Sequence, residues 1–295
     1  MNDIQTLHRE FRFYSETFKG NTRRGVQWLE GCFNSLMTYQ KIEDIRDLNQ
    51  NHLENWLIHG KTEYLWSAKT IRNYLTGVSI FLDWCVSQSH IAFNPAKKIP
   101  RPKLPKRQAK SLTRDQASLI YDYTKIAQYP SSFQKARAIA IIACFLFTGI
   151  RLNELLHLRL IDINLEDRNL FVKQGKCSKD RTIPITSQLV NPLKNYLKEC
   201  ETLKHESPWL FITIAKGKRM QDDVIRRLVE KIRNKTKVSF HPHMLRHTCA
   251  TLLLKSGSDL RPIQKILGHS DISTTMLYLN IEYEHVREQM AKHPL

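Results

Sequence analysis

Four side chains capable of acid/base and nucleophilic chemistry are grouped near the C-terminal end of this chain. His243 and Arg246 are three residues apart, so on a helix they share one face. Gly268 is placed to end a short helix over 262–267, which leaves His269 at an exposed corner. Tyr278 follows in a Ser/Thr-led segment that predicts a helix start. Two imidazoles, a guanidinium and a phenol supply acid/base groups, a phosphate clamp and a nucleophile for phosphoryl transfer.

A second group of polar side chains lies upstream. An apolar segment over 136–148 is broken at Gly149, so Arg151 begins a new helix, where backbone N–H groups and the helix dipole favour an anion. Glu154 is three residues on and is placed to tether that arginine, although a surface Arg–Glu pair gives the same pattern. Residues 170–185 alternate around a Gly- and Lys-rich tip, which predicts a hairpin with Lys176 able to reach a site beside it.

Three histidines in this region also raise the possibility of a zinc site. His243 and His247 are four residues apart, and His241 precedes them. However, Met244 stands where a zinc-protease helix carries its glutamate, and the nearby thiol of Cys249 falls off the histidine face. The sequence therefore favours acid/base chemistry over a metal centre, and we expect no metal.

Together these motifs resemble those of the tyrosine recombinase/integrase family, in particular its Xer-like site-specific recombinases. The resemblance covers about residues 110–290 and preserves the order and spacing of the motifs. Cys177 stands where the family usually has glycine, and Asn280 where histidine is common. The matched motifs are Thr-Gly-x-Arg-x-x-Glu at 148–154, the hairpin lysine Lys176, His-x-x-Arg at 243–246, Leu-Gly-His at 267–269, and Tyr278.

The resemblance implies a site-specific DNA strand exchange without metal, ATP or another cofactor. Tyr278 would attack a scissile phosphate, giving a 3′-phosphotyrosyl enzyme and a free 5′-hydroxyl. Glu154 would support the site. The other catalytic positions implied are Arg151 and Arg246 as phosphate clamp, His269 as a hydrogen-bond donor, His243 as proton acceptor and Lys176 as the acid for the leaving oxygen.

The charge balance independently points to a polyanionic partner. Lys and Arg number 46 against 28 Asp and Glu, a formal net charge of +18, which indicates nucleic acid. We expect phosphate contacts from two places. One is the polar side of the predicted helix 67–87, and the other is a basic, Pro-rich stretch that meets no acid until Asp115. The residues are Lys69, Arg72, Lys103, Lys106 and Arg107.

The predicted fold class is mainly α with a small antiparallel β-sheet in the catalytic domain (α+β). Residues 1–96 read as helical and 97–111 as a basic linker. The resemblance implies that 1–96 form a SAM-like core-binding domain and 112–295 the catalytic domain. The family resemblance adds that the two domains form a clamp around double-stranded DNA. Residues 282–291 predict a short amphipathic helix, which in the family docks on a neighbouring subunit of a tetramer that joins two DNA sites. Packing of that helix on its own domain remains the alternative.

The remaining features indicate a cytoplasmic protein without a membrane partner. Six scattered cysteines without a Cys-x-x-Cys pair are typical of reduced thiols. The N-terminus is polar, and the apolar run 138–147 is too short to span a bilayer.

Three other functions fit part of this pattern. A type IB topoisomerase uses a similar residue set, but the length and helical N-terminal half favour a recombinase. A metal-dependent nuclease is disfavoured because the acidic residues are dispersed. A non-catalytic DNA-binding protein would leave the matched positions unexplained. Dimer resolution and mobile-element integration or excision are not separated by the sequence, nor are the target site or any accessory protein.

Overall fold

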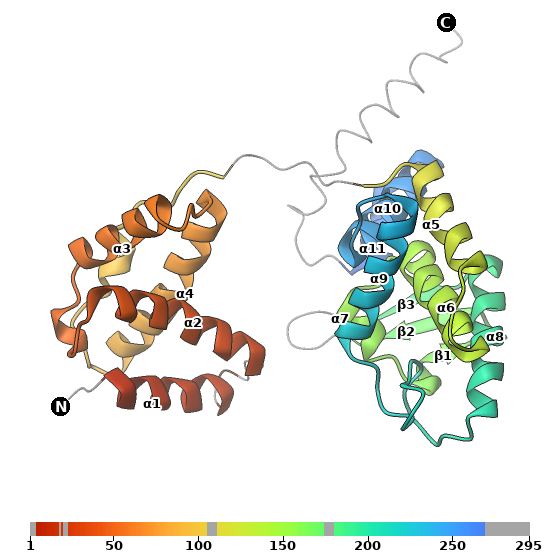
Figure 1. Ribbon diagram of the computed structural model, residues 1–295, viewed down its shortest axis with the longest axis horizontal. Helices are drawn as coiled ribbons and strands as arrows, with labels where there is room; N and C mark the ends of the chain where they lie inside the picture. Colours follow the sequence, from red (N-terminus) through yellow and green to blue (C-terminus); the bar gives the residue numbers. More distant parts are fainter. Residues whose placement is uncertain (1–3, 18, 20–22, 105–110, 174–179, 269–295) are drawn as a thin grey trace, which may run out of the picture. The chain divides into compact units, whose positions relative to one another are not determined.

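The structure, a computed structural model, describes residues 4–17, 19, 23–104, 111–173 and 180–268 (Figure 1). The chain divides into two compact units, Met1–Arg107 and Gln108–Leu295. The described part is mostly helical with one small antiparallel sheet, which confirms the predicted fold class. No helix among the described residues is both long and apolar enough to cross a membrane.

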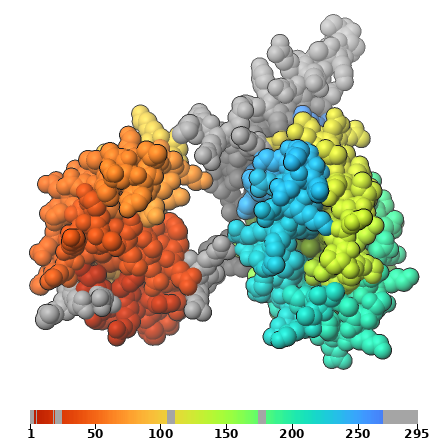
Figure 2. All heavy atoms as spheres, viewed as in Figure 1, coloured from red at the N-terminus to blue at the C-terminus, as the bar shows by residue number. Residues whose placement is uncertain are grey.

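The first unit consists of helices, as the apolar spacing over its length predicts. Its side chains form one continuous body in the space-filling view (Figure 2). Trp56, Leu75 and Phe81 are among the buried residues that hold its helices together. Its elements are α1 (Ile4–Thr17), α2 (Arg23–Gln40), η1 (Ile45–Asp47), α3 (Gln50–Thr62), α4 (Ala68–Ser87) and η2 (Pro95–Lys98).

The segment after α4 folds onto the first unit. Asn94 donates hydrogen bonds to the backbone of α4 and, at 2.9 Å, to Asp83, while Lys97 pairs with the same carboxylate at 2.7 Å. Ile99 is buried in the core of this unit. The predicted linker 97–111 thus begins with residues that contact the first unit, and burial of Ile99 stabilises this packing. The bounds of the linker stay a prediction.

The second unit surrounds its sheet with helices. Its elements are α5 (Arg114–Ile126), α6 (Ser132–Thr148), α7 (Leu152–Leu156), η3 (Leu160–Asp162), β1 (Ile163–Asn164), β2 (Asn169–Val172), β3 (Arg181–Pro184), α8 (Ser187–Thr202), α9 (Asp222–Thr236), α10 (Pro242–Lys255) and α11 (Leu260–Leu267). A capping box opens α5, since Thr113 and Gln116 exchange side-chain and backbone hydrogen bonds.

Helix α6 is the central helix of the second unit. Its apolar sequence leaves almost every residue from Ala138 to Thr148 buried, and α5, α8 and α10 pack around it. A helix that is apolar on all sides requires such cover. Its C-terminal end is therefore held deep in the unit, where it delivers the turn that carries Arg151.

The sheet is a three-stranded antiparallel meander in the order β1–β2–β3. Leu170 pairs with Ile163 on one side and with Ile183 on the other, and Val172 pairs with Arg181. The arms of the predicted hairpin are thus confirmed. Its tip, including Lys176, lies outside the described residues.

Candidate active site

The turn between α6 and α7 places the first arginine. Gly149 has a φ of 61°, a left-handed conformation that favours glycine, and a Cβ at this position would meet Leu267 at 2.6 Å. Thr148 closes the turn by accepting a hydrogen bond from the backbone N–H of Ile150 at 3.2 Å. Arg151 then stands at the N-cap of α7, where the sequence predicted a helix start.

A buried carboxylate lies between two arginines next to this turn. Glu154 accepts from the backbone N–H of Arg151 at 2.9 Å and from its Nη1 at 2.7 Å, which confirms the predicted tether. Arg181 donates to both carboxylate oxygens, at 3.0 and 2.7 Å. The side chains of Glu154 and Arg181 are 9% and 4% exposed, so the pair is shielded from solvent.

Burial alone would raise the pKa of Glu154, but the hydrogen bonds from Arg181 and from the backbone of Arg151 outweigh it. The result is a pKa of about 2, against an ordinary value of 4.5. Glu154 is therefore ionised throughout the working range of an enzyme, and it fixes the guanidinium of Arg151 by charge as well as by geometry.

The second arginine of the site projects from α10 into the protein. Arg246 is 4% exposed and donates to the carbonyl of Gly149 at 2.7 Å and to that of Leu267 at 2.5 Å. Arg151 donates to the carbonyl of Gly268 at 2.9 Å. Both guanidiniums are thus gathered at the C-terminal end of α11, whose last carbonyls have no partner within the helix and carry its negative dipole end.

His243 lies one turn before Arg246 on α10 and is exposed. Its neighbour His241 caps the helix by accepting from the backbone N–H of Met244 at 3.2 Å. Desolvation by neighbouring protein atoms lowers the pKa of His243 below its ordinary 6.5, and the charges of His241, Arg246 and Arg151 lower it further. An imidazole that is neutral at pH 7 is able to accept a proton.

The structure therefore brings together four of the predicted residues: Arg151, Glu154, His243 and Arg246. Lys69, Arg72 and Lys103 belong to the first unit, and all three are exposed. Among the residues described, no group of three or more His, Cys, Asp or Glu side chains is arranged to hold a metal ion. The predicted residues that lie outside the described part of the chain are Lys106, Arg107, Lys176, His269 and Tyr278.

Arg181 is the member of this cluster that the sequence analysis missed. A signal was present, because alternation along β3 puts Arg181 on the same inward face as the buried Ile183. An arginine at an inward strand position needs a buried acid, and Glu154 is the acidic residue that the same analysis had already selected.

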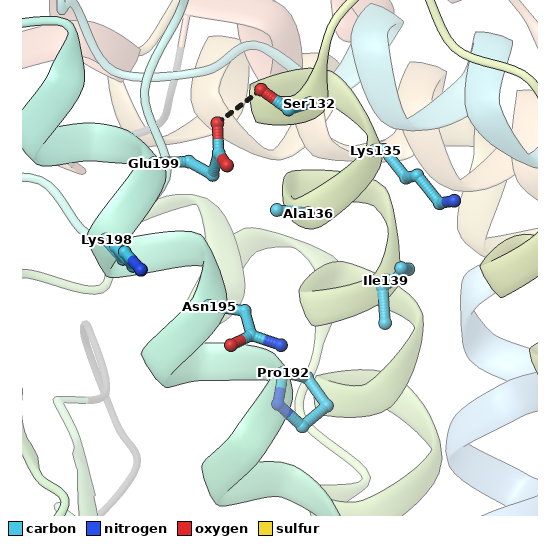
Figure 3. A pocket seen from close by; sticks show the side chains of 8 residues that line it. All are labelled: Ser132, Lys135, Ala136, Ile139, Pro192, Asn195, Lys198 and Glu199. Carbon is cyan, nitrogen blue, oxygen red and sulfur yellow. Dashed lines mark hydrogen bonds between the residues drawn. The ribbon is translucent and has the colours of Figure 1, made fainter.

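A hollow elsewhere in the second unit is separate from this cluster. It measures about 380 Å³ between α6 and α8, and its lining includes Lys135, Lys198 and a Ser132–Glu199 hydrogen bond of 2.5 Å (Figure 3). None of the predicted site residues lines it.

Known proteins resemble this chain in sequence over most of its length. Residues 110–285 match the phage integrase family. The chain is 36% identical to tyrosine recombinase XerA of Pyrococcus horikoshii, a match that covers 67% of this chain and 66% of the relative. It is 34% identical to tyrosine recombinase XerC of Thermodesulfovibrio yellowstonii, over 90% of this chain and 88% of the relative.

Solved structures share the fold. The XerH site-specific recombinase bound to palindromic difH substrate matches with a TM-score of 0.75 and 22% identity, over 90% of this chain and 79% of that chain. A lambda integrase dimer bound to a COC′ core site matches with a TM-score of 0.69 and 18% identity, over 91% and 96%. Fold and sequence together define a tyrosine recombinase, a class of DNA strand-exchanging enzymes. The chain belongs to the phage integrase family, as its motifs predicted.

The buried carboxylate generates a prediction on stability. Glu154→Gln should lower the free energy of unfolding at pH 7 by about 3 kcal/mol, the value of a pKa lowered from 4.5 to about 2. This stabilisation is present above the unfolded pKa and is lost as pH falls through the folded pKa. Urea unfolding of wild type and variant should therefore show a gap at pH 7 that closes between pH 4.5 and 2.

Glu166→Gln is the matched control, because Glu166 is an exposed carboxylate on the β1–β2 turn. That variant should unfold like wild type at every pH. Equal stability of wild type and Glu154→Gln at pH 7, or a gap that persists at pH 2, would contradict the assigned role of Glu154.

Proposed function

We propose that this protein is a site-specific recombinase that cuts and rejoins double-stranded DNA through a 3′-phosphotyrosyl intermediate. The observation that carries the proposal is the convergence of Arg151 and Arg246 on the end of α11, beside a histidine with a lowered pKa. Two guanidiniums held at one point suit a phosphodiester, whose charge they offset as it grows in the transition state.

The first half of the proposed reaction is nucleophilic. The phenol oxygen of Tyr278 attacks the scissile phosphorus, forming a P–O bond to tyrosine while the bond to the 5′-oxygen breaks. Arg151 and Arg246 bind the non-bridging oxygens, and His269 donates a further hydrogen bond. The Arg151 and Arg246 assignments are supported by the geometry above, and those of His269 and Tyr278 by the motif match and by the position of His269 directly after Gly268 in the chain.

The second half is proton transfer. His243 takes the phenol proton, for which its lowered pKa is suited, and Lys176 gives a proton to the leaving 5′-oxygen. The tyrosine ester keeps the energy of the original phosphodiester, so a second 5′-hydroxyl can reverse the step and join new strands. The cycle therefore needs neither a metal ion nor ATP.

The proposed substrate is duplex DNA carrying a specific site. In the solved complexes XerH is bound to palindromic difH substrate and lambda integrase to a COC′ core site, and this chain has a net charge of +18. We propose that the two domains clamp the duplex and that Lys69, Arg72, Lys103, Lys106 and Arg107 contact phosphates. The salt dependence of DNA affinity would measure these contacts. We propose that the enzyme acts on such a substrate in the cytoplasm, which cell fractionation would test.

Changing the nucleophile tests the proposed function directly. Tyr278→Phe should bind DNA with unchanged affinity and form no covalent adduct, because only the attacking hydroxyl is removed. The assay incubates purified protein with sheared genomic DNA from cells that carry this gene, denatures with SDS, and sequences the DNA that remains on the protein. Tyr283→Phe is the matched control and should keep forming the adduct. An adduct with Tyr278→Phe, or none with wild type, would reject the proposal.

The acid role of Lys176 is separable from the rest of the site. Lys176→Ala should slow cleavage by about 10²–10⁴-fold, the usual contribution of a positioned acid. A substrate with sulfur at the 5′-bridging position should be cleaved at nearly the wild-type rate, since a thiolate leaves without a proton. Lys173→Ala and Lys179→Ala serve as controls on the same hairpin. If sulfur rescues one of those variants and not Lys176→Ala, the acid has been misassigned.

We further propose that four copies assemble on two DNA sites, with helix 282–291 of each copy docked on its neighbour. Deleting residues 282–295 should leave binding of one copy to a half-site intact and abolish cooperative assembly and recombination, because a helix of about three turns needs a docking partner. Native gel shifts and a two-site recombination assay measure both. Recombination by the truncated protein would show that the helix packs on its own domain.

A further inference from the structure

Arg181 forms an ion pair with Glu154 and also donates a hydrogen bond to a backbone carbonyl. It begins β3, and its guanidinium is almost fully buried. Two nitrogens hold both oxygens of Glu154, and Nε donates to the carbonyl of Ile266 at 2.6 Å. One side chain thus joins the sheet, the α7 turn and α11.

The contact with Glu154 determines how that carboxylate can hold Arg151. Each oxygen of Glu154 accepts one bond from Arg151 and one from Arg181, so the carboxylate plane is fixed from two sides. Without Arg181, the buried negative charge would retain only Arg151 among these partners. That guanidinium would then be drawn toward the carboxylate and away from a phosphate.

The contact with Ile266 belongs to a series. Three consecutive carbonyls at the end of α11 accept hydrogen bonds from three different arginines: Ile266 from Arg181, Leu267 from Arg246 and Gly268 from Arg151. Arg181 holds the first carbonyl in this series, on the helix side. The next two carbonyls follow directly in the chain and contact the arginines that bind phosphate in the proposed function.

We propose that Arg181 is a positioning residue for strand cleavage, acting through Glu154 and the end of α11 to place the guanidinium of Arg151. This inference rests on the proposed function. It differs from a purely structural role because it requires the cleavage step to depend on Arg181 while DNA affinity does not. Arg181 itself touches no substrate, since Glu154 and Ile266 take its guanidinium.

The test compares Arg181→Lys and Arg181→Met with wild type. The probe is the duplex recovered from wild-type covalent complexes, rebuilt with a nick beside the cleavage point. For Arg181→Met we expect adduct formation to slow by about 10–100-fold, the effect of misplacing a reacting group by about 1 Å. DNA affinity should stay within about twofold. Arg181→Lys keeps the charge but loses the fork that reaches Glu154 and Ile266 together, so its rate should lie between the other two.

Two controls separate positioning from folding and from general charge. Arg168→Met removes an exposed arginine at the opposite end of the same sheet and should cleave at the wild-type rate. In the Glu154→Gln background, Arg181→Met should slow cleavage much less than in wild type, because the route through Glu154 is already lost.

Each outcome of these measurements either supports the proposal or contradicts it. Slower cleavage with unchanged affinity, together with non-additive loss in the double variant, supports the proposal. It is overturned if Arg181→Lys is folded and cleaves at the wild-type rate, or if weaker DNA binding accounts for the whole loss. Arg181→Lys decides the question should Arg181→Met fail to fold. Absence of any adduct with wild type would instead reject the proposed function.

Discussion

The carboxyl end of α11 is the feature on which the rest of the site depends. The last carbonyls of any helix lack partners within it, and here three of them accept from arginine side chains that come from α10, β3 and the N-cap of α7. Segments far apart in the sequence are thereby fixed to one point. The long apolar helix α6 also supports this arrangement, because its buried C-terminal end fixes the position of the turn at Gly149.

The cluster carries an excess of positive charge. Arg151, Arg181 and Arg246 bring three positive charges, and Glu154 supplies one negative charge among the contacts described. Carbonyl dipoles moderate the excess without cancelling it. Desolvation is the main cause of the lowered pKa of His243, and the charges of His241, Arg246 and Arg151 lower it further. Two arginines of the cluster therefore also favour the neutral form of the neighbouring imidazole.

Local sequence patterns predicted much of this architecture. The break at Gly149, the helix start at Arg151, its tether to Glu154 and the arms of the hairpin each follow from a few adjacent residues. Arg181 was missed because its partners are fixed by the pairing of β2 with β3 and by the packing of α11, which no short pattern encodes. The packing of Ile99 in the first unit was missed for the same reason, since its burial is a tertiary effect. Lys176, His269 and Tyr278 stay predictions.

Holding the arginines against backbone has a consequence for the entropy of DNA binding. An arginine side chain has about 2 kcal/mol of rotamer entropy to lose when it is ordered. Arg246 is buried in the absence of DNA, so its side chain loses this entropy when the protein folds and not when it binds the phosphate of the proposed function. In the proposed function, Arg246 would therefore meet the phosphate already ordered, and a distorted or shifted phosphate would gain little from adjustment of this side chain. Selectivity for the geometry of the DNA phosphate backbone would therefore be set by the folded protein before DNA binds.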